Sequence, residues 1–369
     1  MLPKWFNDWN NARPVDIFGP AILIGAIGGA VVVAALLVAY GQPFATTSIQ
    51  TGPRGIGMEV VKFANRAPDP TIADYYTEEP YPREEGEPLA SEIYENVQVL
   101  GGVSEGNFNR LMNAITLWVA PDQGCAYCHA GADEGNYADD DLYTKVVSRR
   151  MIQMTQFINE EWSAHVNANE EVGVNCYTCH RGLNVPAEIW FRIDPVNRSV
   201  EGWSGVQNRA TAQSQFTSLP SDALYRYLYE DNPINVHDLE SRVGDSPADE
   251  GVATWQDTER TFSLMNYMAN SLGVNCVFCH NSRAFYDPSQ FTPQWSTASL
   301  GIDMVQELNN DYLEPLGPVY PPHRLGPVYA DAPKAACATC HQGWNKPMMG
   351  LNMTDDWPEL ATSEAPVYE

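Results

Sequence analysis

The residues with the clearest chemistry lie in one pattern, Cys-x-x-Cys-His, which occurs four times, at 125–129, 176–180, 276–280 and 337–341. Two thiols at this spacing can add to the vinyl groups of a haem as thioethers, and the histidine that follows can ligate the iron. The motifs contain all eight cysteines of the chain: Cys125, Cys128, Cys176, Cys179, Cys276, Cys279, Cys337 and Cys340. The proximal ligands are then His129, His180, His280 and His341. We therefore expect four covalently bound haem c groups.

Two other uses of paired cysteines are zinc knuckles and disulfides. A zinc knuckle does not require a histidine directly after its second cysteine, yet all four copies have one. The complete use of the cysteines in one pattern favours haem. Because c-type haem is attached on the outer side of the bacterial cytoplasmic membrane, the motifs also predict the compartment.

The composition predicts extensive loops, and together with the helical periodicity described below it predicts a mainly α-helical fold with extensive loops. The 369 residues include 27 glycines and 27 prolines, and charged residues make up only 18%. The net charge of −26 argues against binding to nucleic acid, whose phosphates need lysine and arginine. Such a charge is suited to steering a basic soluble partner, although an acidic surface can also serve solubility alone.

The N-terminal region contains a predicted membrane anchor. From Phe18 to Tyr40 no residue is charged, and this stretch is long enough to cross a bilayer as a helix. It is longer than the apolar part of a cleaved signal peptide, which spans about 7–15 residues. Lys4 and Arg13 precede it and the next basic residue is Arg54, which predicts a cytoplasmic N-terminus.

These features divide the chain into four predicted segments: a cytoplasmic tail at 1–16, a transmembrane helix at 17–41, an extended surface segment at 42–104 and a periplasmic tetrahaem domain at 105–369. Apolar periodicity predicts helices near 107–120, 141–166, 257–273 and 301–314, with a short one near 220–230. Asp257 is a plausible N-cap. The acidic C-terminal tail is expected to be peripheral.

The motifs form two pairs, because the connector between the second and third is longer than the spacing within either pair. Motifs one and three have an aromatic residue before the second cysteine, whereas motifs two and four have threonine there and continue His-x-Gly. This predicts a duplicated unit, with two pseudo-symmetric haem-pair halves at about 105–185 and 256–350.

Four haems also need four distal ligands if none is to remain open. Methionines lie on the helix before each of the first three motifs, and Met/His pairs recur in cytochromes c. Spacing leaves these candidates open: Met112, Met151 or Met154, and Met265 or Met268. For the fourth haem the candidates are Met304, His165, His237 and His323.

At this point the chain resembles a known family, the tetrahaem cytochrome subunit of the photosynthetic reaction centres of purple bacteria. The match covers nearly all of 55–360 and rests on long motifs: LMNAITLWVAPDQGCAYCH, SRRMIQMT, W-x-x-HV, GVNCYTCHRG, SLGVNCVFCHN and ATCHQG followed by KP. The resemblance implies that Met112, Met151 and Met265 are distal ligands of the first three haems, and that His165 lies opposite His341. It leaves Met154, Met268 and Met304 as packing residues, and His237 and His323 without haem roles.

The resemblance also implies a function. Such a subunit re-reduces the photooxidised bacteriochlorophyll special pair, which the L and M subunits hold, with electrons from a soluble cytochrome c or a high-potential iron–sulfur protein. The light-harvesting ring is a further possible neighbour. No bond is made or broken, so we expect an electron carrier rather than an enzyme. The expected location is the bacterial inner (photosynthetic) membrane, single-pass, with the haem domain on the periplasmic side. Several relatives are lipoproteins with an N-terminal cysteine, whereas this chain has an apolar helix.

Two other functions fit the motifs less well. A membrane-anchored tetrahaem quinol dehydrogenase also has one N-terminal helix, but such chains are usually shorter and need more spare histidines. A multihaem reductase needs a haem with a vacant site, and here enough candidate ligands exist to close all four. The acidic run Asp139 to Asp141 is a weak candidate for docking or for Ca²⁺, with a solvated loop as the more ordinary interpretation.

Overall fold

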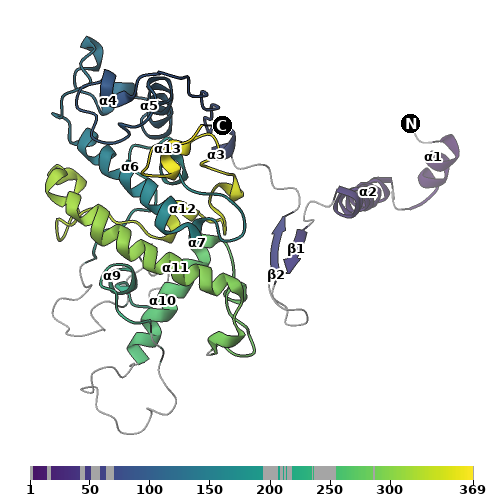
Figure 1. Ribbon diagram of the computed structural model, residues 1–369. Helices are drawn as coiled ribbons and strands as arrows, with labels where there is room; N and C mark the ends of the chain where they lie inside the picture. The colour runs from purple at the N-terminus through teal and green to yellow at the C-terminus, as the bar shows by residue number, and fades with distance from the viewer. Residues whose placement is uncertain are drawn as a thin grey trace, which may run out of the picture. The chain divides into compact units, whose positions relative to one another are not determined.

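The computed structural model describes residues 3–14, 18–41, 46–50, 59–63, 70–193, 207, 211, 213, 218–234, 236, 255–285 and 287–368. The chain divides into two compact units. The first contains the N-terminal helices and a β-hairpin, and the second contains all four Cys-x-x-Cys-His motifs (Figure 1). The described part of the chain is mainly helical, as the composition and periodicity predicted.

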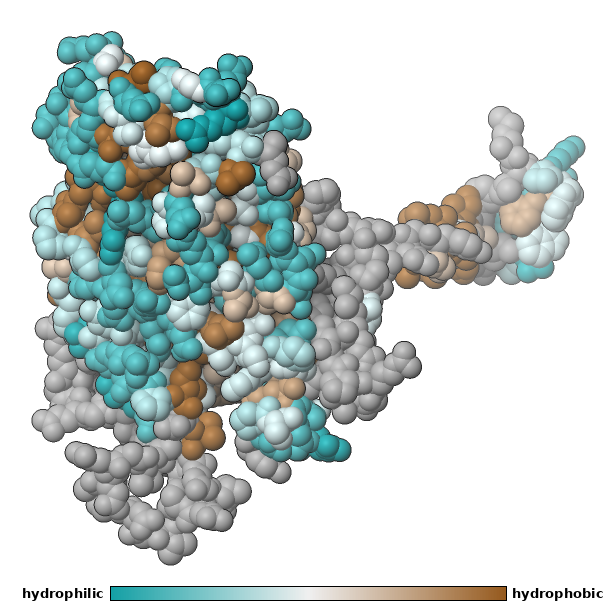
Figure 2. Space-filling model, viewed as in Figure 1, coloured by the Kyte–Doolittle hydropathy of each residue, from teal (hydrophilic) through white to brown (hydrophobic). Residues whose placement is uncertain are grey.

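The first unit begins with α1 (Lys4–Asn11) and α2 (Phe18–Gly41). Residues Ala21–Ala39 have a mean hydropathy of 2.8 and are not buried by the protein, and Figure 2 shows the apolar side chains along this helix in brown. Among the described residues it is the one helix long and apolar enough to cross a membrane. An antiparallel pair follows, β1 (Thr46–Gln50) and β2 (Glu59–Phe63).

In the segment predicted to be extended, the hairpin strands and two single helical turns are the regular elements that the structure describes. The turns are α3 (Pro70–Ala73) and α4 (Ala90–Ile93). The longer helices of the second unit are α5 (Glu105–Val119), α6 (Tyr143–Glu161), α10 (Trp255–Leu272) and α11 (Pro293–Glu307). Its shorter helices are α7 (Ser163–Val166), α8 (Cys176–His180), α9 (Ala223–Leu228), α12 (Cys337–His341) and α13 (Pro358–Ala361).

Three predicted helices have different bounds in the structure. The helix expected at 141–166 is interrupted at Trp162, whose φ of −105° and ψ of 22° separate α6 from α7. Asp257 does not cap α10, because that helix already begins at Trp255. The helix expected at 301–314 starts earlier, at Pro293, a residue whose fixed φ is suited to a first helical turn. It continues beyond Glu307 as a π-helical turn, Leu308–Leu313.

The core of the second unit contains two clusters of buried side chains. One joins α9, α10 and α11 through Leu224, Leu264 and Val305. The other joins α5 to the C-terminal segment, where Trp118 and Trp357 meet edge to face with ring centres 4.7 Å apart. The expectation of a peripheral C-terminal tail is therefore wrong, because Met353, Trp357 and Leu360 are fully buried.

A buried ion pair also holds the C-terminal segment against α5. Arg110 of α5 donates to Glu359 of α13 at 2.8 Å, and neither side chain is exposed. Arg110 also donates to the carbonyl of Asp356 at 2.6 Å and lies over the ring of Trp357. The guanidinium thus connects the helix that precedes motif one to the end of the chain.

Candidate functional site

Motifs two and four have the same local structure. Each forms a single helical turn, α8 or α12, that the motif's own threonine caps: Thr178 and Thr339 accept from the backbone N–H groups of Asn175 and Ala336 at 3.0 and 2.9 Å. The residues directly after the two histidines, Arg181 and Gln342, have left-handed φ values of 48° and 45°. The glycines that follow, Gly182 and Gly343, also have positive φ. The His-x-Gly signature therefore reflects a sharp helix end directly after the histidine.

Motifs one and three share a different structure. Both form short 3₁₀ turns, Gly124–Tyr127 and Cys276–Phe278. The carbonyl of Tyr127 accepts from the hydroxyl of Thr144 at 2.5 Å, and that of Phe278 accepts from Thr292 at 2.7 Å. The small sequence differences between the motifs thus correspond to two types of turn.

Three of the four motif histidines are oriented through Nδ1. Each hydrogen-bonds a backbone carbonyl: His129 to Tyr137 at 3.0 Å, His180 to Leu183 at 2.9 Å and His341 to Trp344 at 2.8 Å. When Nδ1–H donates in this way, the lone pair of Nε2 is free to ligate a metal. Burial lowers the pKa of all three imidazoles, that of His341 to about 4, so the neutral, ligating form is favoured.

His280 differs from the other three. Its Nδ1 is buried and has no hydrogen-bond partner among the described residues. The imidazole instead lies between Phe285, with ring centres 5.2 Å apart, and Phe291, at 4.6 Å. Packing between two aromatic rings, rather than a carbonyl, holds this ligand candidate.

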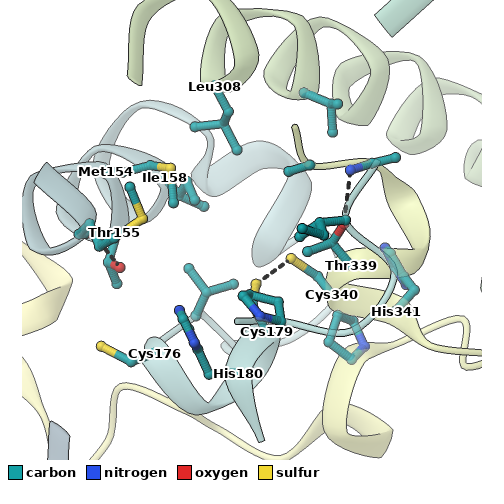
Figure 3. A pocket seen from close by; sticks show the side chains of 18 of the residues that line it. Met154, Thr155, Ile158, Cys176, Cys179, His180, Leu308, Thr339, Cys340 and His341 are labelled. Carbon is teal, nitrogen blue, oxygen red and sulfur yellow. Dashed lines mark hydrogen bonds between the residues drawn. The ribbon is translucent and has the colours of Figure 1, made fainter. Parts of the chain in front are cut away.

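A cavity of about 620 Å³ connects several of the predicted site residues. Figure 3 shows part of it, with α8 on one side and α12 on the other. Its walls include the following predicted site residues: Cys128, Met151, His165, Cys176, Cys179, His180, Cys337, Cys340 and His341. It also receives Met154, which the sequence left as the alternative to Met151.

Motifs two and four meet inside this cavity. The sulfurs of Cys179 and Cys340 are 2.7 Å apart and face each other in Figure 3. Around them the contacts are reciprocal: Arg181 donates to the carbonyl of Cys340 at 3.1 Å, and Gln342 donates to that of Cys179 at 3.4 Å. Within the described ranges, no three His, Cys, Asp or Glu side chains lie together in a way that could hold a metal ion.

Motifs two and four also make matching contacts with the long helices α5 and α10. Gly182 donates to the carbonyl of Trp118 on α5 at 2.8 Å, and Gly343 donates to that of Ser271 on α10 at 2.7 Å. Two asparagines make equivalent contacts in the two halves. The side-chain amide of Asn159 exchanges two hydrogen bonds with the backbone of Val174, at 2.8 and 2.9 Å. That of Asn309 does the same with the backbone of Ala335, at 2.8 and 3.0 Å. Each asparagine thus holds the backbone of the residue that lies two positions before a motif.

His165 is brought next to His341 although the two are far apart in sequence. Its Nδ1 hydrogen-bonds the carbonyl of Thr297 on α11 at 2.8 Å, and the two imidazole ring centres are 6.3 Å apart. Two imidazoles on one metal ion have ring centres roughly 6 Å apart, because each metal–nitrogen bond is about 2 Å and each ring radius about 1 Å. The spacing therefore fits a haem iron between them.

The asparagine correspondence also aligns α6 with α11. Counting back equally from Asn159 and Asn309, Met151 corresponds to Gly301, and Met154 corresponds to Met304. A Cβ at Gly301 would lie 2.6 Å from Cε1 of His165, so the imidazole occupies the space where the second half lacks a side chain. Met304 is buried in the core cluster, and Met154 packs against the same cluster. Positions 154 and 304 thus both contribute to the core cluster, whereas position 301 faces the imidazole of His165. Sequence periodicity does not reveal this difference.

The remaining candidates are placed as follows. Met112 and Met265 are half-buried, whereas Met268 is 9% exposed and belongs to the core cluster. His323 is exposed at the edge of the cavity, and His237 lies outside the described residues. Asp140 is ion-paired with Arg149 at 2.8 Å and Lys145 at 3.1 Å. The middle carboxylate of the acidic run is therefore paired with basic side chains of its own unit.

Sequence reasoning missed the carbonyls that orient the imidazoles, because a backbone acceptor has no residue-type signature. It also missed Gly301, for which an alignment of the two halves on their asparagines was the available signal. In contrast, the His-x-Gly continuation of motifs two and four is a sequence signal for the positive φ found directly after them.

Comparison with known proteins identifies the family of the chain. A family model described as the photosynthetic reaction centre cytochrome C subunit matches residues 41–361. The photosynthetic reaction center cytochrome c subunit of Roseobacter denitrificans is 66% identical over the whole of both chains. That of Rubrivivax gelatinosus is 40% identical, covering 94% of this chain and 91% of its own. That of Thermochromatium tepidum is 42% identical, covering 88% and 77%.

Proposed function

The chain belongs to the photosynthetic reaction centre cytochrome c subunit family, and we propose that it passes electrons from a soluble periplasmic donor, through four haem c groups, to the photooxidised bacteriochlorophyll special pair. Its role in reaction-centre electron transfer and its haem c cofactor follow from membership. The number four, the donor and the special pair as acceptor are our proposal. The observation that carries it is the fourfold Cys-x-x-Cys-His pattern within a family match over 41–361.

We propose that the eight motif cysteines form the thioethers and the four motif histidines are the proximal ligands. The Nδ1–carbonyl bonds of His129, His180 and His341 support this, because they direct Nε2 toward a ligand. When bound, haem supplies a one-electron redox centre whose potential depends on its ligands and their hydrogen bonds.

For the distal side we propose Met112, Met151, Met265 and His165. The spacing of His165 from His341 supports the last of these. The choice of Met151 over Met154 is supported by the alignment with Gly301, because the half that lacks this side chain has His165 in its place. Met112 and Met265 lie six residues before Trp118 and Ser271, the paired acceptors of the two halves, so they occupy equivalent places on α5 and α10.

The contacts between motifs suggest an order of attachment sites that differs from their order in the chain. Motif two packs on α5 next to motif one, motif four packs on α10 next to motif three, and Cys179 meets Cys340 in the middle. We infer the spatial order one, two, four, three, with haem-pair halves at about 105–185 and 256–350. A row of neighbouring sites suits stepwise electron transfer.

The apolar helix α2 indicates that the protein is membrane-associated. We propose a single-pass topology in the photosynthetic membrane, with 1–16 cytoplasmic, 17–41 spanning the bilayer, 42–104 running over a surface and 105–369 periplasmic. Lys4 and Arg13 before the helix support this orientation. The neighbours would be the L and M subunits, with the light-harvesting ring further out.

The decisive experiment is light-induced haem oxidation in isolated membranes, combined with a redox titration. A flash should oxidise a c-type haem at the same rate as the special pair is re-reduced, and the midpoint potentials should be mostly positive, as Met ligation favours. Haem reduction by added quinol in the dark, with uniformly negative midpoints, would instead indicate the quinol dehydrogenase, which the comparisons do not favour.

A further inference from the structure

Lys145 is a buried lysine on α6 whose ammonium group is enclosed by one loop. Only 6% of the residue is exposed. Its Nζ donates to three successive backbone carbonyls, those of Tyr137, Ala138 and Asp139, each at 2.7 Å, and it lies 3.1 Å from a carboxylate oxygen of Asp140. The loop between motif one and α6 is thus folded around the ammonium group of Lys145.

One of these carbonyls has a second donor. The oxygen of Tyr137 also accepts from Nδ1 of His129 at 3.0 Å. A candidate proximal ligand and a buried cation therefore share one acceptor. Motif two offers a comparison within the same chain, where the carbonyl of Leu183 accepts from Nδ1 of His180 at 2.9 Å.

Sharing an acceptor with a cation weakens the bond that the histidine makes. An ammonium group draws electron density from the carbonyl oxygen, and the effect is stronger where little water screens its charge, as at the buried Lys145. A strong Nδ1–H bond makes the imidazole a more basic ligand, which stabilises the more positive ferric iron. A weakened bond has the opposite effect and raises the reduction potential.

We propose that Lys145 is a positioning residue that raises the reduction potential of the haem at motif one by occupying the Tyr137 carbonyl. The inference rests on the proposed role of His129 as proximal ligand. The proposed effect of Lys145 differs from a through-space effect of its charge, because it acts through the hydrogen bond between His129 and the Tyr137 carbonyl, which can be observed separately.

The first test is Lys145→Gln in the full chain within its membrane complex. The amide retains a donor but removes the charge, so the reduction equilibrium of haem one should shift about tenfold toward the ferric form, a potential lower by about 59 mV for a one-electron couple. Arg149→Gln is the matched control, because Arg149 pairs with the same Asp140 but does not touch the Tyr137 carbonyl. Equal shifts in the two variants would overturn the proposal in favour of a simple charge effect.

The second test reads the hydrogen bond itself. Met112→Ala should leave haem one five-coordinate in the ferrous state, and resonance Raman then detects its iron–histidine stretch against three six-coordinate haems. Adding Lys145→Gln should raise this frequency, whereas adding Arg149→Gln should not. An unchanged frequency in the Lys145 variant overturns the inference. If Met112→Ala gives no five-coordinate haem, the ligand assignment has failed instead.

A third variant keeps the proposal falsifiable if Lys145→Gln does not assemble. Asp140→Asn removes the anion paired with Lys145, so the ammonium should polarise the Tyr137 carbonyl more strongly. In the Met112→Ala background the iron–histidine frequency should then fall. A rise, or no change, would contradict the proposal.

Discussion

Among single residues, Gly301 has the most specific role, because its missing side chain determines where an imidazole can lie. A Cβ there would meet three ring atoms of His165, at 2.6, 3.1 and 3.2 Å. The ring cannot withdraw freely, since its Nδ1 is bound to the Thr297 carbonyl at 2.8 Å. Any side chain at 301 therefore competes directly with His165 for the space opposite His341.

This leads to a prediction for Gly301→Met. The new side chain should displace His165 and offer a thioether at the position equivalent to Met151, so the fourth haem should lose its bis-histidine electron paramagnetic resonance signal. Its potential should rise, because Met/His ligation favours the reduced state. Gly317→Met is the control, since nothing lies within 4 Å of a Cβ at that position. Retention of the bis-histidine signal would show that His165 is not the ligand.

A second prediction compares two methionines on one helix face. Met151→Ala should produce a high-spin or altered spectrum at the second haem, because the proposed sixth ligand is lost. Met154→Ala should leave the haem spectra unchanged and lower the free energy of unfolding by about 2–3 kcal/mol, as expected when a partly buried methionine leaves a cavity. A spectral change confined to Met154→Ala would reverse the assignment.

Some site residues could be predicted from the sequence and others could not, for physical reasons. The cysteines and proximal histidines are determined by a local spacing, which requires no knowledge of the fold. Met151 and Met154 lie on the same helical face, so periodicity alone cannot separate them. The pairing of His165 with Thr297 and Gly301 joins segments that only tertiary packing brings together, and residue types carry no signal for it.

Among the elements, the interruption between α6 and α7 has the clearest consequence for the site. A continuous apolar stripe predicted one helix over 141–166, yet the helix breaks at Trp162. The indole nitrogen of Trp162 donates to Glu307 at the end of α11 at 3.0 Å, and α7 then packs on α11. A tertiary hydrogen bond thus overrides local periodicity and directs His165 toward the second half.

The C-terminal segment was mispredicted for a related reason. Its apolar residues Met353, Trp357 and Leu360 step by 4 and 3, but this helical spacing spans only eight residues, includes Pro358 and lies among acidic residues, so composition suggested a surface tail. Their burial depends on α5 and α6, which lie far earlier in the chain: Asn159, 201 positions before Leu360, donates to the carbonyl of Leu360 at 2.8 Å. Long helices were predictable, whereas the segments that close over them were not.

We predict that Arg110→Gln destabilises this closure in a pH-dependent way. Burial raises the pKa of Glu359 above its usual value, even with Arg110 beside it. A carboxyl whose pKa is higher in the folded state loses stability as pH rises from its unfolded pKa through its folded one. Without Arg110 the folded pKa rises further, so the loss should be about 3–5 kcal/mol near pH 7 and smaller near pH 5.

Chemical denaturation at the two pH values, with proteolysis of the C-terminal segment as a local probe, measures this effect. Arg226→Gln is the control, because it breaks an exposed pair with Glu230, at 2.8 Å, that should contribute less than about 1 kcal/mol. Equal losses at both pH values would contradict the prediction, because they would mean that removing Arg110 does not change proton binding by Glu359 between pH 5 and pH 7.

For the whole molecule, the dominant electrostatic property is its net charge of −26. A field of this sign accelerates the approach of a basic soluble donor, and salt screens it within about 10 Å at 0.1 M. We predict that the second-order rate of haem reduction by a basic cytochrome c falls steeply as ionic strength rises. Stopped-flow measurement over a salt series tests this, with an acidic donor as the control. A rate independent of salt would assign the charge to solubility alone.

The crossing of His165 from α7 to the space above Gly301 also has a consequence for reactions with oxygen. The proposed sixth ligand of the last attachment site comes from the opposite half, so the iron there is protected only while α7 stays docked on α11 through the Thr297 carbonyl. If that contact opened, a haem held by His341 would lack its proposed second protein ligand, and an open haem can pass electrons to dioxygen instead of to the next site. On this assignment, the docking of one short helix would limit the loss of electrons to oxygen.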